Sequence, residues 1–199
     1  MIITKTLKGA ICHEWGHCLM YFIKGYIKFV KGIEIIDSFE RVDGHTHINF
    51  VATEGNMELN GAITCYVLEL DNEEKISIFW GGPVAERICK YNKGVLKGTD
   101  KTGVLEITKD KETIKAIENN VVELLVPFKP VLDYLTQETL NNCIVRSTEE
   151  ENYIIISNEK MLAMFRDALN KYGFDFASFD KEGPHIRKQD FNLHHQTSS

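Results

Sequence analysis

The pattern His13-Glu14-Trp15-Gly16-His17 is the part of this sequence that points to a specific chemistry. On a helix, two histidines four residues apart lie one turn apart on the same face, with the intervening glutamate beside them. Two neutral imidazoles placed in this way can hold one Zn²⁺ ion. Glu14 can then act as general base on a water molecule that the ion activates. The motif therefore predicts a zinc-dependent hydrolase site.

The residues around the motif predict that it lies on a largely buried helix spanning residues 4–24. Apolar side chains flank it at mixed spacings of three and four residues, namely Leu7, Ala10, Ile11, Cys18, Leu19 and Phe22. Buried polar groups are costly unless they are paired or bound to a metal. If the motif were only part of a core, its three polar side chains would need three separate partners, whereas one zinc ion satisfies them all.

Length and charge limit the classes of function. A chain of 199 residues fits one domain of ordinary size, and 43% hydrophobic with 26% charged residues is typical of soluble globular proteins. The formal net charge of −6 argues against a nucleic-acid surface or an anionic membrane surface. We therefore expect no nucleic-acid partner and no membrane association.

The cysteine pattern indicates a reducing compartment. The five cysteines are an odd number without CxxC spacing: Cys12, Cys18, Cys65, Cys89 and Cys143. The first apolar stretch is interrupted by the polar motif residues, so no signal peptide is predicted. No apolar stretch is long enough to cross about 30 Å of hydrocarbon. We expect a cytoplasmic protein.

Two antiparallel strands are predicted after the first helix, over residues 26–36 and 44–52. The first is rich in β-branched and aromatic residues, the second alternates, and Asp43-Gly44 suits a turn between them. His45 and His47 share one face of the second strand and are possible substrate contacts. An exposed or hydrogen-bonded pair is the simpler interpretation of these two histidines.

Helices dominate the rest of the chain. We predict a helix over 72–91 that begins at Asn72 and contains Gly81, Gly82 and Pro83, where small residues indicate close packing. A loop over 92–100 follows, and then come a short helical turn at 104–108, helices over 110–126, 130–142 and 158–172, and a short strand at 153–156. Residues 63–70 fit either a strand or a helix.

A third zinc ligand must come from farther along the chain, because catalytic zinc sites usually take three protein ligands and leave one position to water. Two carboxylates are candidates. Asp100 ends the glycine-containing loop, from which its short side chain could reach back to the histidines. Glu86 lies one turn after Gly82, where the helix backbones can approach closely.

Three motifs together resemble the zinc peptidase domain of the FtsH-type ATP-dependent proteases. They are the HExGH residues 13–17, the small-residue segment 81–86 that ends in Ala85-Glu86, and Gly98-x-Asp100. They occur in the family's order, and the resemblance covers residues 7–108. It implies that Asp100 is the third ligand and that Glu86 lies in the second shell around the metal.

The chain also departs from that family. Ile11, Trp15, Pro83 and Arg87 replace residues usual there, and no ATPase motif is found, because Val104 stands where a GxxxxGK phosphate loop needs lysine. A separate ATPase partner, or a homo-oligomer, is therefore a possibility that the sequence leaves open.

The fold class that we predict is α+β, mainly helical: a zincin-like HExxH helix with a small antiparallel sheet, followed by a C-terminal helical bundle. Residues 1–108 would form the zinc peptidase core, 109–180 a helical region packed on it within the same domain, and 181–199 a flexible tail. The leading hypothesis is a zinc metallopeptidase that cleaves extended or unfolded polypeptides bound along the edge of the sheet near residues 44–52. A gluzincin-like regulatory protease using Glu86 as the third ligand, and a catalytically idle zinc-bound scaffold, are the alternatives.

Overall fold

The computed structural model describes residues 5–27, 30–38, 42–48, 70–147 and 151–174. In chain order its elements are α1 (Lys5–Ile23), β1 (Val30–Ser38), β2 (Val42–Ile48), α2 (Asn72–Ile88), α3 (Gly98–Ile107), α4 (Lys111–Leu125), the 3₁₀ turn η2 (Val126–Phe128), α5 (Lys129–Asn142), β3 (Ile144–Ser147), β4 (Glu151–Ser157) and α6 (Asn158–Lys171). The described part is mainly helical with one antiparallel sheet, as the sequence predicts. The ambiguous residues 63–69 and the tail 181–199 lie outside it.

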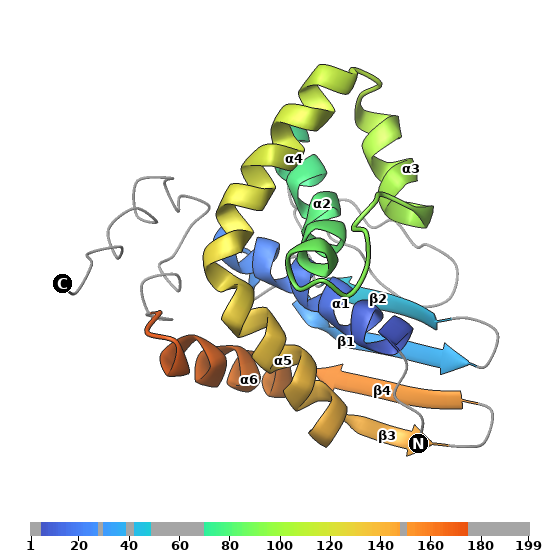
Figure 1. Ribbon diagram of the computed structural model, residues 1–199, viewed down its shortest axis with the longest axis vertical. Helices are drawn as coiled ribbons and strands as arrows, with labels where there is room; N and C mark the ends of the chain where they lie inside the picture. Colours follow the sequence, from blue (N-terminus) through green and yellow to red (C-terminus); the bar gives the residue numbers. More distant parts are fainter. Residues whose placement is uncertain (1–4, 28–29, 39–41, 49–69, 148–150, 175–199) are drawn as a thin grey trace, which may run out of the picture.

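Helix α1 is the central element of the fold, and the helix predicted over 4–24 is confirmed. It lies between the sheet and α2, with α5 and α6 along its other side (Figure 1). Trp15 anchors it: the side chain is fully buried, its indole N–H donates to Thr139 Oγ1 on α5 at 2.9 Å, and its ring packs 5.6 Å from that of Phe165 on α6. The motif helix therefore has apolar contacts on several sides, which hold its polar face in place.

Helices α1 and α2 approach so closely that their backbones touch. A Cβ added to Gly81 would lie 2.7 Å from the carbonyl oxygen of Gly16 and 2.7 Å from Met20 Cγ, too close for any real side chain. The close packing that the glycines of α2 predict is therefore confirmed, because the two helices leave no room for side chains where they cross.

Helix α2 begins at Asn72 as predicted, and its capping residue is Asp71 rather than Asn72. Asp71 accepts from the backbone N–H of Glu74 at 2.8 Å, and Glu74 accepts in return from the N–H of Asp71 at 3.2 Å. This reciprocal capping box satisfies two backbone donors at the helix start. The helix ends at Ile88, short of the predicted residue 91.

The sheet has the strand order β2-β1-β4-β3, and all its pairs are antiparallel. The predicted pairing of β1 with β2 is confirmed, but the predicted turn at Asp43-Gly44 is wrong. Both residues lie inside β2, where Asp43 pairs with Ile36 and Gly44 with Ile35. The hydrogen bonds of the ladder outweigh the turn preference of this dipeptide.

The C-terminal half contributes strands as well as helices. The strand predicted at 153–156 is confirmed as β4, and it pairs with β1. The four-residue strand β3, which lies beyond it, was not predicted because so short a segment carries no clear periodicity. Strands β1 and β2, before residue 108, and strands β3 and β4, after it, therefore belong to one sheet. The C-terminal region is not purely the helical bundle that we predict.

The predicted helices of the C-terminal half are confirmed together with their end signals. Asp110 caps α4 by accepting from the backbone N–H of Thr113 at 3.0 Å, and Pro130 lies in the first turn of α5. Gly173 follows α6 with a φ of +78°, a conformation that favours glycine. None of the described helices combines the length and the apolar character that crossing a membrane requires.

Candidate metal centre

The two motif histidines present the same ring nitrogen to each other. His13 and His17 lie one turn apart on α1, and their Nε2 atoms are 3.0 Å apart. The rings meet edge to face, with centroids 4.7 Å apart. His17 is buried, with 8% of its surface exposed, so its ring is largely withdrawn from water.

Asp100 completes the cluster from 87 residues farther along the chain. Its Oδ2 lies 3.0 Å from His13 Nε2, and its Oδ1 lies 3.6 Å from His17 Nε2. We expected Asp100 at the end of a loop, but that prediction is wrong: α3 begins at Gly98, so Asp100 lies in the first helical turn. Gly98, with a φ of +51°, allows the chain to enter that turn.

The opposite nitrogen of each ring is engaged by a hydrogen-bond acceptor. His17 Nδ1 donates to the backbone carbonyl of Ile78 at 2.8 Å, and His13 Nδ1 donates to Glu86 Oε1 at 2.6 Å. Because a carbonyl oxygen can only accept, the hydrogen of neutral His17 must be on Nδ1, which leaves a lone pair on Nε2. Histidine ligands in metal sites are oriented by such contacts, in which Nδ1–H donates to a carboxylate or a backbone carbonyl.

The electrostatics of the cluster favour a positive charge at its centre. Burial acts to lower the pKa of His13, but hydrogen bonds to Asp100 and Glu86, with the nearby charge of Glu14, raise it to about 10. Burial likewise acts to raise the pKa of Asp100, yet hydrogen bonds from His13 and His17 hold it well below its usual range. Two nitrogen lone pairs and a carboxylate that face one another therefore need a cation between them, either a proton or a metal ion.

The spacing and type of the donor atoms are compatible with a transition-metal ion such as zinc. The three ligand atoms all lie within 4.8 Å of one another. A tetrahedral ion about 2.0–2.1 Å from each nitrogen would separate neighbouring ligand atoms by about 3.3 Å. The two Nε2 atoms are 3.0 Å apart, His13 Nε2 is 3.0 Å from Asp100 Oδ2 and His17 Nε2 is 3.6 Å from Asp100 Oδ1, so each nitrogen has a carboxylate oxygen near that separation. Two imidazoles with one carboxylate suit a transition-metal ion such as zinc, whereas Ca²⁺ and Mg²⁺ prefer oxygen ligands alone.

Helix α2 supports the cluster from behind. A Cβ on Gly82 would lie 2.5 Å from His13 Nε2 and 2.6 Å from its Cδ2, so the ring rests directly against the α2 backbone. Glu86, one turn later, binds the Nδ1 side of the same ring and is 13% exposed. The structure thus places Glu86 behind His13, on the side away from His17 and Asp100.

Glu14 is buried next to His13 in the chain. It is 4% exposed, and its negative charge contributes to the raised pKa of His13. One contributor to the site was not predicted. The carbonyl of Ile78, which contacts His17 Nδ1, is a backbone group without a sequence signal.

The strand histidines lie on β2 at the edge of the sheet. In the register of the sheet His45 pairs with Glu34 and His47 with Gly32. Their side chains lie outside the described residues, so their contact with substrate stays a prediction.

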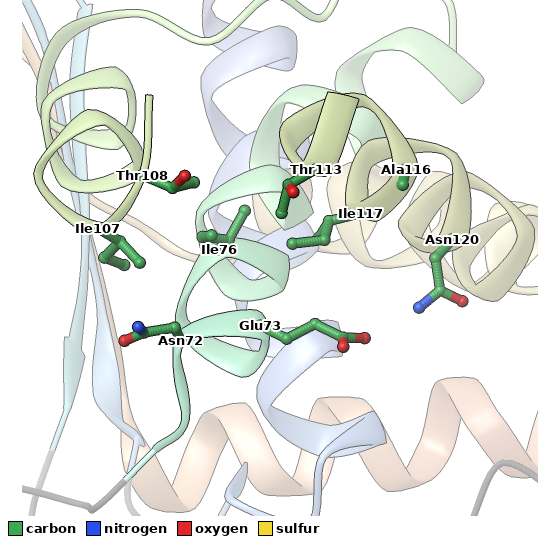
Figure 2. A pocket seen from close by; sticks show the side chains of 9 residues that line it. All are labelled: Asn72, Glu73, Ile76, Ile107, Thr108, Thr113, Ala116, Ile117 and Asn120. Carbon is green, nitrogen blue, oxygen red and sulfur yellow. The ribbon is translucent and has the colours of Figure 1, made fainter. Parts of the chain in front are cut away.

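A separate cavity of about 680 Å³ lies between the beginning of α2, the end of α3 and α4 (Figure 2). Its lining is mixed, with Ile76, Ile107 and Ile117 beside Asn72, Asn120 and Glu73. None of the three clustered residues lines it. The cavity therefore does not belong to the histidine–aspartate cluster.

Comparison with known proteins identifies no relative: no family model, no curated protein and no solved structure matches this chain.

Proposed function

We propose that this protein is a zinc-dependent metallopeptidase. The observation that carries the proposal is the convergence of His13 Nε2, His17 Nε2 and the Asp100 carboxylate, while both Nδ1 atoms are held by acceptors. A structural cluster of two histidines and one aspartate would not need both rings turned with their free nitrogens toward the same point. A fourth, open ligand position is the usual feature of catalytic zinc sites.

The side chains have separate roles in this proposal. His13, His17 and Asp100 hold the zinc ion. Zinc bound there would lower the pKa of a water molecule toward about 7 and polarise a peptide carbonyl. Glu14 accepts the proton of the attacking water and delivers it to the leaving amine.

The resemblance to the FtsH-type peptidases is consistent with this proposal. The three segments that carry it, residues 13–17, 81–86 and 98–100, supply the clustered histidines, the support by Gly82 and Glu86, and the third carboxylate. These three segments are far apart in the sequence but meet at one place in the structure. A separate ATPase partner and a homo-oligomer both stay predictions.

Substrates are proposed to be extended or unfolded polypeptide segments. Strand β2 pairs with β1 on one side, and among the described strands its other edge has no neighbour. An extended peptide can add to such an edge through backbone hydrogen bonds, with little dependence on its side chains. The cytoplasmic location is also a proposal, supported by the buried side chains of Cys12, Cys18, Cys89 and Cys143, none of which forms a disulfide with another described cysteine.

The alternatives are less well supported by the geometry. A gluzincin-like site would need Glu86 on the Nε2 side of His13, whereas its carboxylate binds Nδ1. A catalytically idle scaffold would use the carboxylate of Glu14, which is 4% exposed, only as a structural group, so the activity of Glu14 variants distinguishes it from the peptidase.

Glu14→Gln is the variant that tests the proposal. We expect the purified wild-type protein to bind one zinc ion and to cleave an unfolded substrate such as casein, with activity lost on chelation. Glu14→Gln should keep zinc and lose hydrolysis, because the amide cannot accept the proton. His13→Ala should lose both. Full activity in Glu14→Gln, or a wild-type protein that binds no zinc, would contradict the proposal.

A further inference from the structure

We propose that Tyr21 is a further catalytic residue, whose phenol donates a hydrogen bond to the substrate carbonyl oxygen as negative charge develops on it. The inference rests on the proposed peptidase function. It adds a residue that no motif in the chain assigns.

Tyr21 lies on the face of α1 that carries the site. It follows His17 by four residues and Glu14 by seven, spacings that place all three side chains along one side of a helix. Side chains on a helix lean toward its N-terminus, so the ring of Tyr21 leans back over the turn that contains His17. The phenol is thus directed toward the cluster rather than away from it.

The hydroxyl of Tyr21 has no hydrogen-bond partner among the described residues. The residue is 6% exposed, yet within the described part of the chain no hydrogen bond involves its side chain. A buried tyrosine hydroxyl usually finds a partner. Among the described residues, Trp80 Nε1 is the one side-chain donor or acceptor that is both fully enclosed and without a partner. Because the Tyr21 oxygen also has no partner but is not in that class, it keeps some contact with solvent. A donor that is withdrawn but reachable can serve an incoming substrate.

The surroundings keep Tyr21 in its donor form. Burial, and then the charges of Cys18 and Asp100, raise its pKa above the ordinary value for tyrosine. The phenol therefore stays protonated throughout the neutral range. Asp100 can act on this pKa only if the ring lies within its electrostatic reach, which agrees with the placement of Tyr21 beside the cluster.

A neutral donor at this position stabilises the transition state more than the substrate. The carbonyl oxygen gains negative charge during attack, and a hydrogen bond to a charged acceptor is stronger than one to a neutral carbonyl. The contribution should therefore appear mainly in kcat, with a small effect on KM.

Tyr21→Phe removes the donor and keeps the ring. With a fluorogenic peptide substrate we expect kcat to fall about 100-fold, the usual effect of losing one such donor. Zinc content and Tm should equal those of the wild type. The inhibition constant of a phosphonamidate peptide, which mimics the transition state, should rise by a similar factor, while the Kd of a product peptide stays unchanged.

Tyr91→Phe is the matched control. The hydroxyl of Tyr91 contacts Asp133 Oδ1 at 3.5 Å, away from the cluster, so this variant should keep full activity. If Tyr21→Phe keeps wild-type kcat and inhibitor binding, the inference about Tyr21 is overturned but the proposed function is not. A loss of zinc or a lower Tm in this variant would also overturn the inference, because Tyr21 would then have a structural role. A wild-type protein without hydrolysis or inhibitor binding would overturn the proposed function as well.

Discussion

His13 Nδ1 donates to Glu86 Oε1 across 2.6 Å, and this contact between α1 and α2 turns the other nitrogen of the ring toward His17 and Asp100. The ring is held between a carboxylate on one side and the cluster on the other. The role that we assign to Glu86 is therefore to position a ligand rather than to be one.

Glu86→Ala is expected to weaken zinc binding about 10–100-fold, the usual loss when such a supporting contact is removed. The stoichiometry should stay at one ion, because the three ligand atoms remain. Competition with a zinc-sensitive dye measures the affinity. Glu86→Gln, which keeps an acceptor oxygen, should lose less. Complete loss of zinc by Glu86→Ala, with normal binding by Asp100→Ala, would instead favour the gluzincin-like alternative.

Asp100→Ala is expected to abolish stoichiometric zinc binding, because it leaves two imidazoles without the third ligand. For the wild type, zinc at 100 times its Kd should raise the free energy of unfolding by about 2.7 kcal/mol. Urea unfolding with and without zinc measures this difference, which Asp100→Ala should lose. Glu106→Ala, on the exposed side of the same helix, is the control and should keep the full shift.

Gly82→Ala is expected to weaken zinc binding more than it weakens folding. The added methyl group would press on the His13 ring at 2.5 Å and move a ligand nitrogen. Gly81→Ala is the matched variant, since the nearest atoms to its methyl belong to Gly16 and Met20 at the helix crossing rather than to His13. It should lower Tm more strongly. We therefore expect Gly82→Ala to lose more zinc affinity and Gly81→Ala to lose more thermal stability when both quantities are measured for both variants. If one variant loses more of both, the proposed contact between Gly82 and the His13 ring is contradicted.

The ion pair between Arg87 and Glu118 is expected to make stability depend on pH. Glu118 is 7% exposed and accepts from Arg87 Nη1 at 2.6 Å and Lys115 Nζ at 2.9 Å. Burial acts to raise the pKa of Glu118, but these hydrogen bonds lower it below the ordinary value. Its stabilising effect is therefore complete above the unfolded pKa of about 4.3 and is lost as the pH falls through the lower folded pKa.

Glu118→Gln should consequently cost about 1.5–3 kcal/mol at pH 7, the usual contribution of hydrogen bonds to a charged group. The difference from the wild type should shrink as the pH falls below about 4. Urea unfolding at a series of pH values tests this. Glu123→Gln, an exposed residue of the same helix, should show no such trend. A difference that persists unchanged at the lowest pH would rule out the ion pair as its cause.

The sequence by itself determined the local features of this protein. The span of α1, the cap at Asp110, the proline that begins α5 and the glycine after α6 follow from hydrogen bonding and periodicity within a few residues. The HExxH spacing belongs to the same class, because a helix alone brings His13 beside His17.

Only the tertiary structure decided what meets that helix. It brings Asp100 to the histidines across 87 residues, places Glu86 behind the ring of His13, and inserts β4 beside β1. It also sets Asp43-Gly44 within a strand, where the ladder outweighs the local turn preference. These arrangements depend on the packing of whole elements against one another, and the energy of such packing is not contained in any short stretch of the chain.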